Sequence, residues 1–509
     1  MIIKIALLVV FFAIMVGVGI YSRQSTKSVD GFVLGGRSVG PWLTAFAYGT
    51  SYFSAVVFVG YAGQFGWKYG LASTWIGIGN AVIGSLMAWV ILGRRTRVMS
   101  QHLQSKTMPH FFGERYQSKG IKIVASVIAF VFLVPYTASV YNGLSRLFGM
   151  AFDIPYSVCV IVMALFTAVY VIVGGYMATA INDFIQGIIM LFGIVAVIAA
   201  VLSGQGGFVE AIRKLAEIPS DVAITAGQQG AFTSFFGPDP FNLVGVVILT
   251  SLGTWGLPQM VHKFYAIKDE KAVKTGTIIS TLFAVVVSGG CYFLGGFGRL
   301  FDDKSLYDVA TGNIIYDSII PFMLSKLPDI LIGVVIVLVL SASMSTLSSL
   351  VLTSSSTLTL DFLKGNVIKK MSEKKQGFVM QVLIVFFIVV SVVIALDPPT
   401  FIAQLMGISW GALAGAFLAP FLYGLYWKKV TRAAVWASFM AGVGITVANM
   451  LHPFIASPIN AGAIAMVAGL VVVPIVSLIT PKMKKEEVDK IFACYDEEVK
   501  TSKKRSLEM

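Results

Sequence analysis

A run of hydroxyl side chains interrupts the otherwise apolar segment 330–360. The run reads Ser341-Ala342-Ser343-Met344-Ser345-Thr346-Leu347-Ser348-Ser349 and continues with Ser354 to Ser356. Positions 342, 345, 346 and 349 recur at spacings of three and four residues, so a helix places them on one face. Hydroxyl oxygens are hard ligands that suit a hard cation such as Na⁺, although each hydroxyl can also bond to a carbonyl of its own helix. Packing therefore remains an alternative, but the density of hydroxyls favours cation coordination.

A single carboxylate begins another apolar segment. Asp183 follows Asn182 and is itself followed by a thoroughly apolar stretch. A carboxylate inside a membrane is costly and is a functional candidate by default. The alternative is that Asp183 caps a helix, because a negative charge is favourable at a helix N-terminus. The spacing alone supports both interpretations.

Several aromatic residues with a polar group fall inside or near the predicted cavity. They are Tyr48, Tyr52, Tyr136, Trp255 and Trp410. Tyr and Trp combine a packing surface with a hydrogen-bonding group, which suits a small solute that is partly apolar, although such residues also form membrane-interface belts. The candidate solute contacts are Ser51, Tyr52, Ser54, Tyr136, Thr254 and Trp255.

The elements that must position these residues are membrane spans. Of the 509 residues, 57% are hydrophobic and only 12% are charged, about half the charge of a soluble globular protein. The apolar residues form blocks of about 20, the length that crosses a hydrocarbon core. We predict an all-α integral membrane protein of about 13 transmembrane helices. The predicted spans are 3–22, 41–63, 70–93, 121–148, 155–174, 182–202, 241–261, 275–298, 330–360, 377–396, 400–427, 432–451 and 461–480.

The basic residues between the spans predict an orientation. Most of the 38 Lys and Arg residues fall in the loops on one side, which the positive-inside rule assigns to the cytoplasm. The N-terminus is then outside, and the C-terminus is cytoplasmic. Net charge is +13, but its location in short loops argues against nucleic acid as a partner. We expect a multi-pass protein of the cell membrane, for which a monomer is sufficient.

The number of spans also predicts an internal repeat. Spans two to six cover 41–202 and spans seven to eleven cover 241–427, so two groups of five enter the membrane from opposite sides. Both groups begin with a stretch interrupted by small and polar residues, Tyr48–Ser54 in the first and Thr250–Pro258 in the second. Small residues often serve helix packing, but interrupted helices at matching positions of inverted halves are a pointer to a transporter site.

The remaining segments complete the division of the chain. They are an N-terminal helix and loop (1–40), an outer connection (203–240), two further helices (428–480) and a basic cytoplasmic tail (481–509).

The sequence contains no recognisable enzyme constellation. The four histidines lie in predicted loops or at membrane edges without metal spacing, and the cysteines Cys159, Cys291 and Cys494 share no close spacing. A phosphate-binding loop is absent, so ATP-driven transport is unsupported. The doublet Gly35-Gly36 reads as a turn. We predict a carrier that is not an enzyme; a channel or a membrane-embedded sensor stays open.

Three motifs in order resemble the sodium:solute symporter family over essentially the whole chain. They are Leu34-Gly35-Gly36-Arg37-Ser38, then Gly174-Gly175 with Asn182-Asp183-Phe184-Ile185-Gln186-Gly187, and Met344-Ser345-Thr346-Leu347-Ser348. The resemblance implies a LeuT-like core of two inverted five-helix repeats, preceded by one helix and followed by two. It also implies sodium-coupled import of a small organic solute by alternating access.

The resemblance further implies the sodium ligands. A first site takes the backbone carbonyls of Thr50, Phe53 and Ala342 and the hydroxyls of Ser345 and Thr346. A second site, present in some members, takes Asp183, Ser345, Ser348 and Ser349. One or two coupling sodium ions are therefore expected.

The resemblance leaves the solute open between an amino acid such as proline and a carboxylate such as pantothenate. Proline carriers have an acidic residue where this chain has Tyr52, and the stretch around Trp255 looks loosely closer to the pantothenate-type branch. The main alternative is a proton-coupled carrier of the same fold, with Asp183 as the titrating group.

Overall fold

The described part of the chain is built of helices. The computed structural model describes residues 2–22, 28–152, 154–364 and 366–495. Parts of the N-terminal segment 1–40, predicted as a helix and a loop, and of the basic tail therefore lie outside the described residues. The α-helices are α1 (Ile2–Ser22), α2 (Val29–Leu34), α3 (Pro41–Tyr52), α4 (Ala62–Tyr69), α5 (Thr74–Gly79), α6 (Arg94–His102), α7 (Met108–Arg115), α8 (Lys119–Phe152), α9 (Tyr156–Gly204), α10 (Phe208–Glu217), α11 (Pro240–Leu252), α12 (Pro258–Ala266), α13 (Glu270–Gly295), α14 (Tyr316–Ser325), α15 (Asp329–Thr357), α16 (Glu373–Leu396), α17 (Ile402–Tyr426), α18 (Arg432–Leu451), α19 (Pro458–Ile479) and α20 (Lys485–Phe492).

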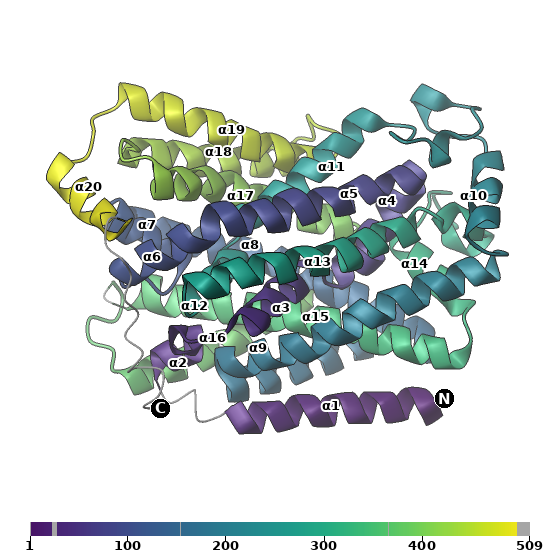
Figure 1. Ribbon diagram of the computed structural model, residues 1–509, viewed down its shortest axis with the longest axis horizontal. Coiled ribbons are helices and arrows are strands. Elements are labelled where there is room, and N and C mark those ends of the chain that lie inside the picture. The colour runs from purple at the N-terminus through teal and green to yellow at the C-terminus, as the bar shows by residue number, and fades with distance from the viewer. Residues whose placement is uncertain (1, 23–27, 153, 365, 496–509) are drawn as a thin grey trace.

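The long helices lie side by side along one direction (Figure 1). Within the described residues, ten are long and apolar enough to cross a bilayer, or eleven if α11 and α12 form one bent span. The predicted total of thirteen stays a prediction, because breaks and short helices leave the count open. One of these short helices is the apolar stretch Tyr156–Val169.

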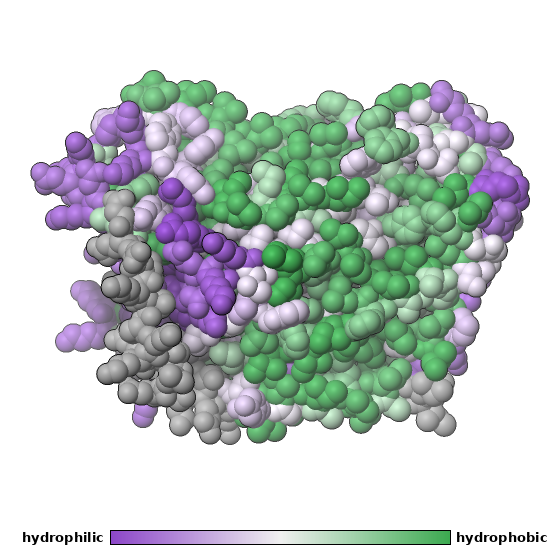
Figure 2. Space-filling view, viewed as in Figure 1, coloured by the Kyte–Doolittle hydropathy of each residue, from purple (hydrophilic) through white to green (hydrophobic). Residues whose placement is uncertain are grey.

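The polar helices gather at the two ends of the bundle. In Figure 1, α2, α6, α7 and α20 lie at one end, whereas α10 and the start of α1 lie at the other. Figure 2 shows apolar side chains over the middle of the visible face and hydrophilic side chains towards its two ends. This pattern fits a bilayer that surrounds the middle of the bundle, since apolar surface is stable there.

Two of the spans are broken inside the bundle. Helix α3 ends at Tyr52, and the chain continues as a π-helix, η3 (Val56–Tyr61). The second break separates α11 and the 3-10 turn η9 (Gly253–Trp255) from α12, with a bend of 41°. Here Pro258 cannot donate a backbone hydrogen bond and disfavours helical geometry in the residue before it. Leu257 accordingly has an extended ψ of 121°.

A third break divides α9 at Gly175. This residue has φ 55° and ψ −159°, a conformation open essentially to glycine alone. The helical geometry therefore restarts at Tyr176, and Asp183 lies about two turns inside the new helix. The alternative that Asp183 caps a helix N-terminus is wrong, because the predicted boundary at residue 182 falls inside the helix.

Glycine brings α4 and α5 onto the backbone of α13. A Cβ on Gly66 of α4 would overlap the backbone of Gly295, and a Cβ on Gly77 of α5 would lie 2.7 Å from the Cα of Gly289. Small residues allow such close approach between membrane helices. Gly49 and Gly66 meet Phe283 and Gly295 in ascending order, whereas Gly77 and Gly93 meet Gly289 and Val273 in descending order. The chain therefore reverses its direction along α13 between α4 and α5.

The Gly-Gly-Arg-Ser motif forms an anchored turn between α2 and α3. Gly35 and Gly36 have φ values of 57° and 67°, which agrees with the predicted turn. The Arg37 guanidinium donates to the carbonyls of Tyr265 at 3.2 Å and Ser105 at 2.5 Å. The motif thus ties this loop to the end of α12 and to the segment after α6.

Candidate functional site

The broken end of α3 meets the hydroxyl face of α15 at the centre of the site. The Ser345 hydroxyl donates to Thr50 Oγ1 at 2.7 Å. The Thr346 hydroxyl lies 3.3 Å from the Thr50 carbonyl, 3.4 Å from the Ser51 carbonyl and 3.1 Å from the Ala342 carbonyl. The side chains of all five residues are buried. The site is therefore a dry cluster of carbonyl and hydroxyl oxygens, which are the donors that a hard cation requires.

Phe53 stands at the break itself. Its φ of −108° and ψ of 83° are not helical, and its ring stacks on that of Tyr52 at 4.2 Å. The backbone leaves helical geometry within three residues of Thr50, so carbonyls near the break are freed from the regular helical pattern.

Not every hydroxyl of the run faces α3. Ser343 donates to the carbonyl of Val339 at 2.7 Å, and Ser348 donates to that of Ser345 at 2.9 Å. These hydroxyls are satisfied within α15, as the packing alternative expects. The inter-helix contacts come from Ser345, Thr346 and Ser349.

Asp183 lies beside this cluster and faces a lysine. Its Oδ2 is 3.7 Å from the Lys263 ammonium, and both side chains are almost completely buried. The ammonium donates to Ser349 Oγ at 2.9 Å, and Ser349 is in turn 2.8 Å from Ser51 Oγ. The ring of Tyr176 lies 5.3 Å from the same ammonium. A positive charge thus stands among the residues predicted for a second sodium site.

Lys263 is the residue of the candidate site that the sequence interpretation missed. The predicted span ended at residue 261, so Lys263 was assigned to a cytoplasmic loop. Helix α12 instead continues to Ala266, and the neighbouring His262 is buried as well. His262 thus lies in a helix rather than in a loop; whether the histidines lie at membrane edges stays a prediction. Successive polar residues in a short half-helix lower its hydropathy, which concealed its burial.

A cluster of aromatic rings adjoins the broken end of α3. Trp410 of α17 lies 6.1 Å from the Tyr52 ring and 5.9 Å from the Tyr136 ring. The Tyr52 hydroxyl donates to the Thr250 carbonyl at 2.5 Å. In contrast, the Tyr136 hydroxyl and the Trp410 indole N–H have no hydrogen-bond partner in the described part of the chain. Buried polar groups of this kind normally have a partner, so within the aromatic cluster these two groups are candidates to receive a solute.

The other predicted solute contacts are already engaged. The Thr254 hydroxyl lies 3.2 Å from the Gly84 carbonyl, and the Trp255 indole donates to the Ile83 carbonyl at 3.0 Å. Ser54 Oγ accepts from the Val56 backbone at 3.1 Å. The Ser51 hydroxyl lies beside Ser349, which accepts a hydrogen bond from Lys263. The structure therefore brings Tyr52 and Tyr136 together but does not gather all six candidates around one space.

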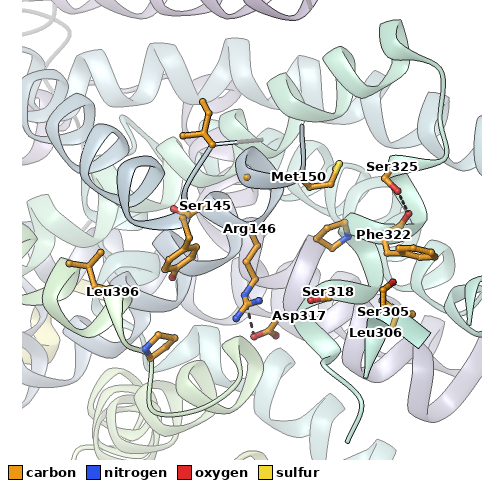
Figure 3. A pocket seen from close by; sticks show the side chains of 15 residues that line it. Ser145, Arg146, Met150, Ser305, Leu306, Asp317, Ser318, Phe322, Ser325 and Leu396 are labelled. Atoms are coloured by element: carbon orange, nitrogen blue, oxygen red, sulfur yellow. Dashed lines mark hydrogen bonds and ion pairs between the residues drawn. The ribbon is translucent and has the colours of Figure 1, made fainter. Parts of the chain in front are cut away.

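A separate cavity of about 580 Å³ opens between α8 and α14 (Figure 3). Arg146 of α8 points into it and lies 4.0 Å from Asp317 of α14, and the backbone N–H of Ile402 donates to the same carboxylate at 3.2 Å. Arg146 comes ten residues after Tyr136 on one helix, about 15 Å away. The cavity therefore lies towards one end of the bundle, beyond the aromatic cluster.

Asp317 should make stability depend on pH. Burial raises the pKa of Asp317 to about 6, although Arg146 and the Ile402 N–H lower it. The folded protein then binds more protons than the unfolded chain between about pH 4 and 6, so this group destabilises the fold as pH rises through that window. The difference from the ordinary value of 3.8 corresponds to about 3 kcal/mol.

We expect Asp317→Asn to remove that dependence. The thermal unfolding midpoint of each protein is measured in detergent at pH values from 4 to 7. As pH rises, the midpoint of the unsubstituted protein should fall relative to that of Asp317→Asn. Asp302→Asn, a change at an exposed position, is the control and should keep the original profile. Parallel profiles for Asp317→Asn and the unsubstituted protein would contradict the prediction.

Known proteins resemble this chain over nearly its whole length. The sequence profile of the sodium:solute symporter family matches residues 32–442. Sodium/proline symporters of Staphylococcus aureus strains are 27% identical over 500 residues, covering 94% of this chain and 92% of theirs. These relatives do not support the loose leaning towards the pantothenate-type branch.

Solved structures share the fold. A Na⁺-coupled sialic acid symporter in a substrate-bound outward-open state superposes with a TM-score of 0.75 at 18% identity, covering 95% of this chain and 98% of that one. Mhp1, a nucleobase-cation-symport-1 family transporter, gives a TM-score of 0.52 at 14% identity, covering 91% and 98%. The predicted class, an all-α membrane protein with a LeuT-like core, is confirmed. Because the profile covers most of the sequence, the chain belongs to the sodium:solute symporter family.

Proposed function

We propose that this protein imports a small organic solute together with sodium by alternating access. The observation that carries the proposal is the oxygen cluster between the break of α3 and the hydroxyl face of α15, where Ser345 and Thr346 contact Thr50. Sodium bound there, with Thr50, Phe53, Ala342, Ser345 and Thr346 as ligands, would add a link between two helices that already share hydrogen bonds.

Coupling follows from this position. Sodium must bind the solute-competent state more tightly than the other state, because a ligand with equal affinities shifts no equilibrium. An ion between α3 and α15 favours the arrangement in which both helices supply oxygens. Tyr52, next to the sodium ligands, belongs to the aromatic cluster, so the same arrangement fixes that cluster. By reciprocity, solute should tighten sodium binding by the same factor.

The aromatic cluster supports a small, partly apolar solute with one or two polar groups. Tyr136 and Trp410 offer a hydroxyl and an indole N–H, both of which can donate to a carboxylate or carbonyl oxygen. An amino acid such as proline fits this description, and so does a small carboxylate. The sodium/proline symporter relatives favour proline as the first compound to test.

The orientation is part of the proposal. The end that carries α2, α6, α7 and α20 (Figure 1) holds many of the basic loop residues, so we assign it to the cytoplasm. The Arg146 cavity then faces outwards and offers a positive charge to an incoming carboxylate. We retain the predicted repeats, 41–202 and 241–427, as the two halves of the core.

Purified protein in proteoliposomes tests the function. Uptake of labelled proline, and of a panel of amino acids and carboxylates, is measured with an inward sodium gradient and with potassium in its place. We expect one compound to accumulate only with sodium, and counterflow of that compound to require sodium as well. Full-speed accumulation in potassium medium would end the proposal. Accumulation driven by a proton gradient would favour the proton-coupled carrier, and no accumulation of any compound would favour a channel or sensor.

A further inference from the structure

The sequence resemblance implies a second sodium site, but a lysine from another helix stands in it. The predicted ligands are Asp183, Ser345, Ser348 and Ser349. The Lys263 ammonium donates to Ser349 at 2.9 Å and lies 3.7 Å from the Asp183 carboxylate. Its exposure is only 2%, so bulk water does not solvate the charge. We propose that Lys263 is a built-in cation that takes the place of the second sodium ion, so that this protein binds one sodium.

The geometry makes the two cations mutually exclusive. An ion coordinated by both Asp183 and Ser349 would need the space between them, which the ammonium occupies. Ser348 makes no contact with Asp183 or Lys263 in this arrangement; its hydroxyl donates within α15, to the Ser345 carbonyl at 2.9 Å. Only Ser345 of the predicted set is directed to the first site, where it bonds to Thr50.

The charge balance leads to the same conclusion. One buried carboxylate and one buried ammonium are neutral together, which is how buried charges are normally accommodated. A sodium ion added beside them would leave an uncompensated positive charge within a few ångströms of the ammonium, in a medium that screens charge poorly. Without the lysine, the Asp183 carboxylate would need another cation to remain ionised, and sodium is the abundant one that fits hydroxyl and carboxylate ligands.

The Lys263 ammonium differs from a free ion because its side chain attaches it covalently to the protein. Lys263 belongs to α12, the half-helix that follows the second break. Through Ser349 and Ser51 its ammonium connects with the residue after Thr50. The cation therefore cannot leave with the solute, and it adds no ion to the transport cycle.

Equilibrium binding of ²²Na⁺ to the purified full chain tests the inference without knowledge of the solute. The inference rests on the proposed function, since it assumes a first sodium site. At saturating sodium with choline as the replacement ion, we expect one sodium per unsubstituted protein and two for Lys263→Met, which removes the charge but keeps an apolar chain of similar length. Lys263→Arg keeps the charge and should bind one. Lys268→Met, an exposed lysine beyond the same helix, should also bind one.

The variant Asp183→Asn/Lys263→Met provides the decisive control. It removes both charges, so no carboxylate remains to hold a second ion, and one sodium is expected. Two sodium ions on the unsubstituted protein would overturn the inference and leave sodium coupling intact. Should Lys263→Met fold poorly, the number of sodium ions bound by the unsubstituted protein decides between one sodium site and two. A folded Lys263→Met that binds one sodium would also overturn it, whereas no saturable sodium binding to any variant would instead contradict the proposed function.

Discussion

The double variant Ser345→Ala/Thr346→Ala should need at least about ten times more sodium for half-maximal uptake, which corresponds to about 1.4 kcal/mol or more of sodium binding energy. Both hydroxyls contact the broken end of α3 and are fully buried. Their removal leaves sodium with backbone carbonyls alone at this side of the site. Initial rates of solute uptake in proteoliposomes, measured over a range of sodium concentrations, give the half-maximal value directly.

A matched control uses two other serines of α15. Ser343 and Ser355 donate to carbonyls of their own helix at 2.7 and 3.2 Å, so Ser343→Ala/Ser355→Ala removes two hydroxyls without touching α3. Its sodium dependence should be unchanged. An unaltered half-maximal sodium concentration in Ser345→Ala/Thr346→Ala, with solute uptake preserved, would remove these hydroxyls from the mechanism.

Asp183→Asn should destabilise the fold much more than a typical single substitution. It leaves the Lys263 ammonium buried without its carboxylate, and breaking one side of a buried ion pair costs about 3–5 kcal/mol. Thermal midpoints in detergent and the yield of monodisperse protein should both fall sharply. The effect comes from an unpaired charge in a dry site, so added salt should restore little of the loss.

The second substitution should reverse the first. Adding Lys263→Met to Asp183→Asn removes the unpaired charge, so the double variant should be more stable than Asp183→Asn alone. This cycle measures the coupling between the two residues. Additive losses, with the double variant worse than either single variant, would show that the pair does not interact in the way that its geometry indicates.

The sequence predicted the hydroxyl face of α15 well, because helical periodicity depends only on the spacing of residues. Positions 345, 346 and 349 do face α3 together, and the Ala342 carbonyl accepts from Thr346 beside them. The breaks in α3 and between α11 and α12 were also visible in advance, because small and polar residues interrupt the apolar stretches there and Pro258 restricts the backbone of the second one. In each case the signal lay within a few consecutive residues.

What the sequence did not reveal depends on contacts between distant segments. The burial of Lys263 follows from Asp183 and Ser349, which lie in two other helices. The depth of Asp183 follows from the position of the Gly175 break rather than from the hydropathy around it. Likewise, nothing in the local sequence indicated that Thr254 and Trp255 bond to the carbonyls of Gly84 and Ile83. Hydropathy averages over a window, whereas the partner of a polar group is one particular atom.

The glycine contacts on α13 divide the bundle into parts that can and cannot separate. At Gly66–Gly295 and Gly77–Gly289, no side chain stands between the helices, so sliding there would bring Cβ atoms of neighbouring residues into collision. Helices α4, α5 and α13 should therefore travel as a single rigid body. The junction of α3 with α15 instead includes hydrogen bonds between hydroxyls and carbonyls, which water can replace at little cost. A rearrangement that opens the protein to one side of the membrane would therefore separate α3 from α15, at the proposed sodium site.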